Sequence, residues 1–424
     1  MSRTFTAVRA RTRGTWRNML LFLAVLGPGI ITAFVDNDAG GITTYSVAAA
    51  TYGNRLLWTV VPMTIALVVV QEMSARMGVV TGKGLADLIR ENFGARITAL
   101  LMGSLLLANI ANTVSEFAGV AAGAEILGIP RWVSVPIGAI LVWVLIVKAS
   151  YRAVERIFLV LSGFYIAYII SGVMAKPDWG VVLKAAVVPT FTFSKSYILM
   201  FIGLVGTTIA PWMQFYLQSS VVEKRIPVAE YRYSRLDVVV GCIVTDVVTF
   251  FILATVAATL FTHGVHIETA RDAAQALAPL AGKYAALLFS FGLMNASLFA
   301  ASVLPLTTAY YVCEAVGWEA GVNHSFREAP VFYGLYTAII IIGAAIVLIP
   351  GAPLIFLMIV SQVINGILLP FILVFQLVLI NNRRIMGGYV NSRFGNAVGW
   401  VTTAAMVAMS LVLVAVSVFP KLAG

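Results

Sequence analysis

Charged residues are scarce in this sequence of 424 residues. Asp, Glu, Lys and Arg together make up 11% of the chain, whereas hydrophobic residues make up 60% and the mean hydropathy is +0.96. Soluble globular domains carry about 25% charged residues. Here the apolar runs repeatedly exceed the roughly 20 residues that cross a bilayer as a helix. The composition excludes a soluble domain and predicts a polytopic membrane protein in a lipid bilayer.

Cysteine and histidine are also scarce, and this limits the chemistry that the chain can perform. Cys242 and Cys313 lie far apart, in or next to apolar segments, and we interpret them as small buried hydrophobic residues. His263, His266 and His324 all fall in predicted loops, and no H-E-x-x-H motif occurs. An intramembrane hydrolase would need such groups at membrane depth. We therefore predict that the protein is not an enzyme and uses no cofactor.

The formal net charge of +10 suggests nucleic acid as a partner, but the positions of the basic residues suggest membrane topology instead. Lys and Arg lie in short loops between apolar spans, and 20 of the 28 fall on one side of the membrane if the N-terminus is cytoplasmic. The positive-inside rule then predicts a multi-pass inner-membrane protein with a cytoplasmic N-terminus and an extracytoplasmic C-terminus. We expect no nucleic-acid partner and no obligate protein partner.

Apolar runs and polar gaps predict an all-α membrane domain of about eleven transmembrane helices over residues 1–424. An odd number of helices in a repeat inverts the second copy, so residues 19–175 and 197–381 are predicted to form two inverted repeats, with 397–419 as an additional helix. The predicted helices are 19–50, 57–80, 97–127, 132–150, 157–175, 197–221, 237–262, 284–313, 331–349, 354–381 and 397–419.

The first helix of each repeat is predicted to be broken near the middle of the membrane. Segment 36–41 (DNDAGG) interrupts the apolar stretch 21–50, and Ala210-Pro211 interrupts 199–220. Irregular backbone at that depth is tolerated only where it lines a cavity or is buried in protein, and a pair of such breaks points to the binding site of a transporter. The alternatives are an extramembrane turn for the first break and a simple proline kink for the second.

Two long stretches carry a resemblance to a known family. Residues 71–94 (QEMSARMGVVTGKGLADLIRENFG) and 361–388 (SQVINGILLPFILVFQLVLINNRRIMGG) are similar to the second and tenth helices, with their following loops, of the Nramp metal-ion transporters, especially the prokaryotic Nramp-related magnesium transporters. Asp36 falls where the family motif Asp-Pro-Gly-Asn begins, and residues 210–212 (APW) fall where the family usually has Met-Pro-His. The resemblance covers almost the whole chain and implies a leucine-transporter-type fold with five-plus-five inverted repeats.

The departures from the family pattern suggest a hard cation. Transition-metal sites favour imidazole, thiolate or thioether ligands, whereas magnesium and calcium take oxygen. Ala210 stands in place of the family thioether and Trp212 in place of its imidazole, so the site keeps Asp36, Asp38, amides and freed carbonyl groups. Ala210 also leaves volume for water. We therefore predict transport of magnesium that keeps part of its water shell, with manganese as a second ion.

Other polar residues complete the predicted site. Gln362 and Asn365 lie three apart on one face of helix 10, and Gln362 matches a family position in the substrate pathway; interhelical hydrogen bonding is the alternative for both. The family Asn corresponds to Asn37, Asp38 or Gly40, and Met213 and Gln214 are alternatives at the second break. The predicted metal-binding residues are Asp36, Asn37, Asp38, Gly40, Ala210, Gln214, Gln362 and Asn365.

Proton coupling is not expected from the residues on helix 3. Family members usually carry several acids there, but this segment has only Glu116, with Asn109 and Gly119 where acids would fall, and Trp212 replaces the histidine of the proton route. We predict uptake driven by membrane potential, which favours a divalent cation by about 4.6 kcal/mol at 100 mV. Ala210, Trp212 and Glu116 are the predicted selectivity and coupling residues.

Two alternative functions remain open from the sequence. One is a proton-coupled transition-metal transporter for manganese or iron, of the Nramp type. The other is a sodium-coupled amino-acid transporter of the same fold, although two acids in the first break would repel the substrate carboxylate. Glu116 and Asp246 are acids at membrane depth that serve either an ion or an interhelical contact, and Glu72 with Arg76 is predicted to form an i,i+4 ion pair.

Overall fold

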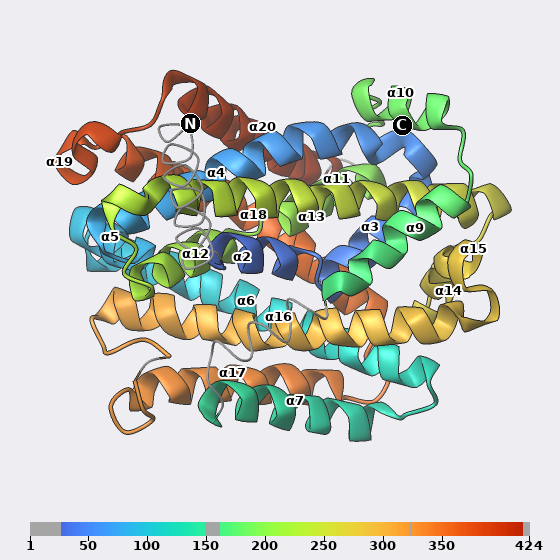
Figure 1. Ribbon diagram of the computed structural model, residues 1–424, viewed down its shortest axis with the longest axis horizontal. Coiled ribbons are helices and arrows are strands. Elements are labelled where there is room, and N and C mark those ends of the chain that lie inside the picture. The colour runs from blue at the N-terminus through green and yellow to red at the C-terminus, as the bar shows by residue number, and fades with distance from the viewer. Residues whose placement is uncertain (1–26, 149–161, 323, 419–424) are drawn as a thin grey trace, which may run out of the picture.

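The chain folds into a bundle of helices in which no strand occurs within the described residues (Figure 1). This computed structural model describes residues 27–148, 162–322 and 324–418. Within these ranges, nine helices are long and apolar enough to cross a membrane, or up to ten if one bent pair counts as a span. The number is below eleven because predicted helices 1 and 2 join into one apolar unit, Ala39–Thr81, and predicted helix 5 corresponds to the bent pair, its first residues lying outside the described ranges.

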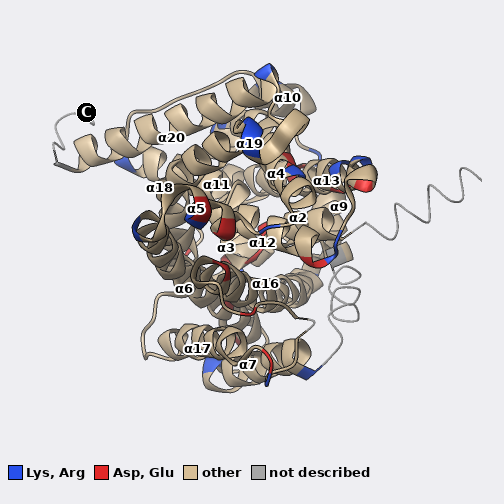
Figure 2. Ribbon diagram, turned by 90° about the vertical axis from the view of Figure 1, so that its left-hand side faces the viewer, with Lys and Arg blue, Asp and Glu red and all other residues tan. Residues whose placement is uncertain are grey.

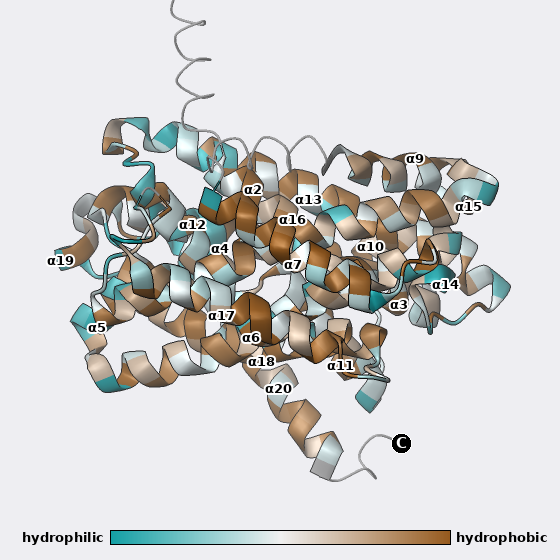
Figure 3. Cartoon of the chain, turned by 90° about the horizontal axis from the view of Figure 1, so that it is seen from below, coloured by the Kyte–Doolittle hydropathy of each residue, from teal (hydrophilic) through white to brown (hydrophobic). Residues whose placement is uncertain are grey.

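Most of the bundle consists of long helices that lie roughly along one axis (Figure 1). Brown, hydrophobic segments fill the middle of Figure 3, and teal segments gather near α5 and α19 at one end and near α14 and α15 at the other. This distribution is typical of a membrane bundle. The long helices are α4 (Val60–Thr81), α6 (Ala95–Ile126), α7 (Arg131–Lys148), α13 (Tyr231–Thr259), α16 (Ala285–Val316), α17 (Pro330–Val347), α18 (Leu354–Ile380) and α20 (Arg393–Val418).

The first predicted break lies between α2 (Pro28–Asp36) and α3 (Ala39–Tyr52). Asn37 leaves helical geometry with φ −84° and ψ 46°, and Asp38 is extended with φ −73° and ψ −173°. The Asp38 Oδ1 accepts a hydrogen bond of 2.6 Å from the Gly41 amide, which is the usual role of an aspartate at a helix N-cap. A short polar sequence therefore stops one helix and starts the next.

The second break lies between α11 (Lys195–Thr208) and α12 (Pro211–Glu223). Proline disfavours helical geometry in the residue before it, and Ala210 accordingly has φ −66° and ψ 138°. Pro211 itself suits the first position of a helix, where its missing N–H costs nothing. The break is therefore a restart of the helix rather than a kink within one continuous helix.

Helix α2 is fastened to α13 at its N-terminus. No side chain of α2 or of its N-cap residue Gly27 caps this end. Instead, the Asp237 carboxylate on α13 accepts hydrogen bonds from the amides of Gly27 at 3.2 Å, Gly29 at 2.7 Å and Ile30 at 3.3 Å. A Cβ atom at Gly29 would lie 2.6 Å from the Val238 backbone nitrogen, so the two helices approach as closely as glycine allows.

Short helices lie at the two ends of the bundle. Figure 2 looks onto the end that carries α5 (Leu85–Phe93) and α19 (Arg383–Met386), where charged residues lie on both helices. The opposite end holds α14 (Ala270–Ala274) and α15 (Ala278–Ala281). α9 (Ile166–Met174) and α10 (Trp179–Val187) are bent from each other by 118°, so the segment expected as a loop between residues 175 and 197 contains a helix.

The predicted ion pair at the α5 end of α4 is confirmed. Arg76 Nη2 lies 3.0 Å from Glu72 Oε2, at the expected i,i+4 spacing. Arg76 also donates to Asn391 Oδ1 at 2.8 Å, and Tyr231 of α13 donates to Glu72. The pair therefore joins α4 to α13 and to the segment before α20, and its role in this structure is to hold these elements together.

Candidate metal-ion site

Asp36 ends α2 and is 2% exposed. Neither of its carboxylate oxygens has a hydrogen-bond partner among the described residues. Buried polar groups are almost always hydrogen-bonded, and an ionised carboxylate without a partner is far more costly to bury. A buried acid with both oxygens free, at the point where a membrane helix is broken, is the geometry expected of a cation ligand.

Asn37 turns away from Asp36 and toward α13. Its Nδ2 lies 3.3 Å from the Thr245 carbonyl oxygen and 3.4 Å from Thr245 Oγ1, and its Oδ1 accepts from Thr249 Oγ1 at 3.2 Å. The Asn37 carbonyl oxygen accepts from the Tyr165 hydroxyl at 2.7 Å. Both polar atoms of this side chain therefore have a protein partner. These hydrogen bonds attach the first break to α13.

Asp38 points to α6 and meets Glu116. The Asp38 and Glu116 side chains are neighbours, and Glu116 Oε2 accepts a hydrogen bond from the Ala39 amide at 3.2 Å. Both side chains are buried, Glu116 completely. The structure therefore brings the predicted ligand Asp38 and the predicted coupling residue Glu116 together at the N-terminus of α3, where the helix dipole favours negative charge.

Gly40 allows α18 to approach the first break. A Cβ atom at Gly40 would displace the Gln362 side-chain nitrogen and would lie 3.0 Å from Ser115 Oγ, so glycine leaves room here for the Gln362 amide. Gln362 Oε1 accepts from Asn365 Nδ2 at 3.0 Å, and Asn365 exchanges two hydrogen bonds with Asn112 of α6, at 2.9 and 3.0 Å. The predicted residues Gly40, Gln362 and Asn365 thus lie together, and both amides take part in an interhelical network.

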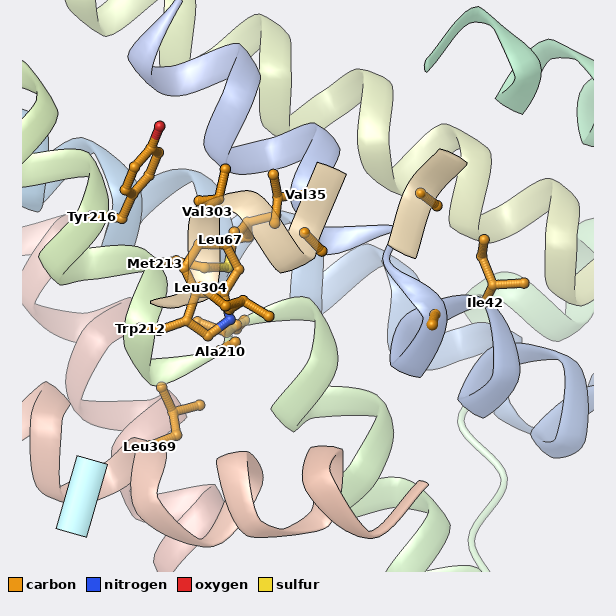
Figure 4. Packing of buried hydrophobic residues seen from close by; sticks show 14 of the residues in the cluster. Val35, Ile42, Leu67, Ala210, Trp212, Met213, Tyr216, Val303, Leu304 and Leu369 are labelled. Carbon is orange, nitrogen blue, oxygen red and sulfur yellow. The ribbon is translucent and has the colours of Figure 1, made fainter. Parts of the chain in front are cut away.

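The second break contributes apolar surface. Ala210 and Trp212 are each 2% exposed and belong to the buried cluster that also contains Val35 and Leu304 (Figure 4). In the amide orientation that satisfies its hydrogen bonds, Gln214 donates to the carbonyl oxygens of Ala210 at 2.9 Å and Pro211 at 2.6 Å. Gln214 therefore binds carbonyl groups of its own break.

Two residues beside Asp36 were not among the predicted ligands. Tyr45 of α3 shares a hydrogen bond of 2.8 Å with Thr208, the last residue of α11, and so links the two breaks. Asp246 of α13 is 2% exposed, and both of its carboxylate oxygens lack a described hydrogen-bond partner. The sequence signal for Asp246 is a carboxylate in the middle of an apolar helix. That Asp246 lies beside Asp36 could be learned only from the fold.

The ligand set around the first break is an oxygen set. Within the described ranges, no group of three or more His, Cys, Asp and Glu is arranged to hold a metal ion. His266 and His324 lie outside the candidate spans, and His263 is the last residue of the candidate span Val228–His263, in a 3-10 turn. Carboxylates, backbone carbonyls and water are therefore the ligands that this region offers, and these suit a hard divalent cation.

A cavity of about 620 Å³ lies at the end of the bundle that carries α5. Its lining includes Asp87, Glu223 and Glu314 but none of the predicted site residues. Burial raises the pKa of Asp87, and the nearby Glu91 carboxylate raises it further, although the Gly84 amide, Lys83 and Arg90 lower it. The cavity is therefore an acidic pocket that does not include the predicted site residues at the breaks.

Comparison with known proteins identifies the family. Residues 29–416 match the family described as "Nramp: Natural resistance-associated macrophage protein-like". The chain belongs to the Nramp family. The leucine-transporter-type fold is confirmed as well, because an Nramp structure, the Eremococcus coleocola manganese transporter, superposes with a TM-score of 0.74 at 22% identity over 92% of this chain and 86% of that chain. MhsT, crystallised with L-phenylalanine, superposes with a TM-score of 0.61 at 15% identity over 91% of this chain and 98% of that chain.

Curated relatives extend over the full Nramp domain. A protein from Deinococcus radiodurans named "Divalent metal cation transporter MntH" is 30% identical over 421 residues, which cover 95% of this chain and 92% of the relative. The MntH protein of Bacillus subtilis is 28% identical over 419 residues, 96% of each chain. Membership of the Nramp family and the many apolar helices show a multi-pass membrane protein.

Proposed function

We propose that this chain transports divalent metal cations across the membrane by alternating access, with the cation bound at the first break. The observation that carries the proposal is the buried Asp36 carboxylate, whose two oxygens lack described partners at the broken helix. Ionisable residues in such positions mark ion pathways. The names of the MntH relatives support the class of substrate.

The preferred ion of this proposal is magnesium, with manganese as a second substrate. Ala210 and Trp212 supply neither thioether nor imidazole at the second break. Magnesium is usually bound by one or two carboxylates and keeps several waters, which agrees with a site that has few side-chain ligands. Transport is then driven by membrane potential alone.

The second candidate is a proton-coupled transporter of manganese or related transition metals. Two features favour it over magnesium transport: the relatives include a manganese transporter, and Asp38 meets Glu116 on α6. Two neighbouring carboxylates repel each other, and a proton on one of them relieves this repulsion. If the arriving metal displaced that proton, metal uptake would be coupled to proton transfer. Trp212 stands in place of the family histidine, so no imidazole is present there to carry the proton further.

The test is metal uptake into proteoliposomes with internal pH recorded at the same time. With an inside-negative potential, the wild-type protein is expected to accumulate Mg²⁺ and Mn²⁺ without internal acidification, and Asp36→Ala is expected to abolish uptake of both. Glu268→Gln, which removes an exposed carboxylate from the α14 end of the bundle, is the matched control and should behave as wild type.

Each outcome selects one function. Acidification that follows the metal would replace the first candidate with the second. Sodium-dependent uptake of amino acids without metal transport would overturn both and support the amino-acid alternative. Unchanged metal uptake in Asp36→Ala would remove the first break from the mechanism.

A further inference from the structure

Asp246 is a buried carboxylate with no cationic partner among the described residues. It lies in the interior of α13, which runs from Tyr231 to Thr259, and is 2% exposed. On insertion scales, an aspartate at the centre of a membrane helix has a large unfavourable free energy of insertion. Neither oxygen has a hydrogen-bond partner among the described residues. A cost of this size needs compensation from something that binds there.

The turn of α13 that carries Asp246 is aligned with the first break. Thr245 donates to the Ala33 carbonyl oxygen and contacts Asn37, and Thr249, one turn later, donates to Asn37 Oδ1 at 3.2 Å. These contacts position the α13 turn against the last turn of α2, where Asp36 stands. Asp246 and Asp36 are therefore neighbouring carboxylates that repel each other when both are charged.

Within the part of the chain that the structure describes, no Lys, Arg or His balances the two carboxylates by forming an ion pair with Asp36 or Asp246. Their ionisable neighbours include the Tyr45 and Tyr165 hydroxyls, the Cys242 thiol of α13 and Asp38, none of which is a cation. The nearby Thr64 hydroxyl of α4 already donates to the Val60 carbonyl oxygen at 2.8 Å.

We propose that Asp246 is a second carboxylate ligand of the transported cation, which it binds together with Asp36. This inference rests on the proposed function and deepens it by naming the charge of the site. Two buried carboxylates carry a formal charge of −2, which a divalent cation neutralises without a proton or a protein cation. Two carboxylates with water as the remaining ligands form a usual environment for Mg²⁺.

The arrangement also explains why the site works without soft ligands. Attraction of a divalent ion to two carboxylates in a region of low dielectric depends on charge rather than on a thioether or imidazole. A monovalent cation would neutralise one carboxylate and leave the other uncompensated. Asp246 thus favours divalent over monovalent ions, and this preference does not require an additional Met or His.

The test compares Asp246→Asn with the wild-type protein in purified form. Titration calorimetry with MgCl₂ and MnCl₂ measures the Kd, and thermal unfolding is recorded with and without each metal. We expect Asp246→Asn to raise both Kd values at least tenfold and to remove most of the metal-induced rise in Tm, while the metal-free Tm stays equal or increases because the repulsion of Asp36 is relieved. Asp246→Glu keeps the charge and should retain more affinity than Asp246→Asn.

The outcomes separate this inference from the proposed function. If the wild-type protein neither binds nor transports either metal, the proposed function fails. If the wild-type protein binds metal and Asp246→Asn shows the same Kd and the same metal-induced rise in Tm, Asp246 is not a ligand and this inference alone fails. Should Asp246→Asn not fold, Asp246→Ser gives the same test, and Glu268→Gln controls for loss of a carboxylate elsewhere.

Discussion

The two broken helices occupy corresponding places in the fold but differ in chemistry. The first break has carboxylates on either side of Asn37, and its neighbours on α6, α13 and α18 are polar. The second break contains no charged residue, and Ala210 and Trp212 lie in an apolar cluster (Figure 4). The first break therefore supplies charge to the site, and the second supplies apolar shape.

This difference indicates that each half of the site can be altered separately. A change of charge at the first break should affect binding and transport with little loss of packing. A change of side-chain volume at the second break should affect protein stability and ion selectivity, while the protein should still bind a divalent cation. The two breaks are linked only through contacts such as that of Tyr45 with Thr208.

The largest effect is expected from removing charge at the first break. Asp36→Asn has nearly the same volume but lacks the carboxylate, so the initial rate of Mg²⁺ or Mn²⁺ uptake by proteoliposomes should fall at least a hundredfold. Ala210→Ser, a small polar change at the second break, should stay within about threefold of wild type. Equal losses in the two variants would contradict the division of roles between the breaks.

The next largest effect is a loss of stability from the second break. Trp212 is 2% exposed, and truncating a large aromatic side chain in a packed core costs about 3–5 kcal/mol. Trp212→Ala should therefore lower the Tm of the purified protein, while Trp212→Phe, which keeps an aromatic ring, should lower it less. Metal affinity of the folded Trp212→Ala fraction, measured by calorimetry, should change by less than tenfold; a complete loss of binding would show that Trp212 shapes the ligand set.

A smaller effect is expected on ion choice. Ala210→Met places a thioether at the second break, and thioethers favour softer metals such as Cd²⁺ over Mg²⁺. The ratio of Cd²⁺ to Mg²⁺ affinity should increase about tenfold, as measured by competition during Mn²⁺ uptake. Ala210→Leu adds similar volume without sulfur and serves as the control. If both variants change the ratio equally, volume rather than the ligand atom determines the choice.

The breaks themselves could be predicted from the sequence because their causes are local. Carboxylates and glycines in an apolar stretch, and a proline in another, predict interruption of the helices near Asp36 and Ala210, and α2 ends at Asp36 while α12 begins at Pro211. The histidines were predicted to lie in loops because they fall in polar gaps between apolar stretches. His266 and His324 do lie outside the helices, and His263 ends a 3-10 turn.

The partners of the site residues could not be predicted, because they are distant in sequence. Asn37 was a predicted ligand, yet its amide is bound by Thr245 and Thr249, more than 200 positions away. The fastening of α2 by Asp237 bridges 208 positions from Gly29. Neither contact has a local signature, because an Asp or a Thr in an apolar helix is compatible with many partners. The helix α10 was likewise not predicted, because residues 175–197 were expected to form a loop.

The smallest expected effect concerns the anchoring of the first break rather than its charge. The Asp237 carboxylate caps α2 through three amides, and loss of a helix cap costs about 0.5–2 kcal/mol. Asp237→Ala should therefore release α2 from α13 more often. Cys242 lies five residues further along α13 and is 1% exposed, so its labelling by a small thiol reagent reports this release. In a Cys313→Ser background, Asp237→Ala should label Cys242 several-fold faster than the same background with Asp237 intact, and Asp237→Asn, which keeps one acceptor oxygen, should be intermediate. An unchanged labelling rate would mean that Asp237 does not hold α2, and that the polar contacts at Asn37 are sufficient to keep the first break in place.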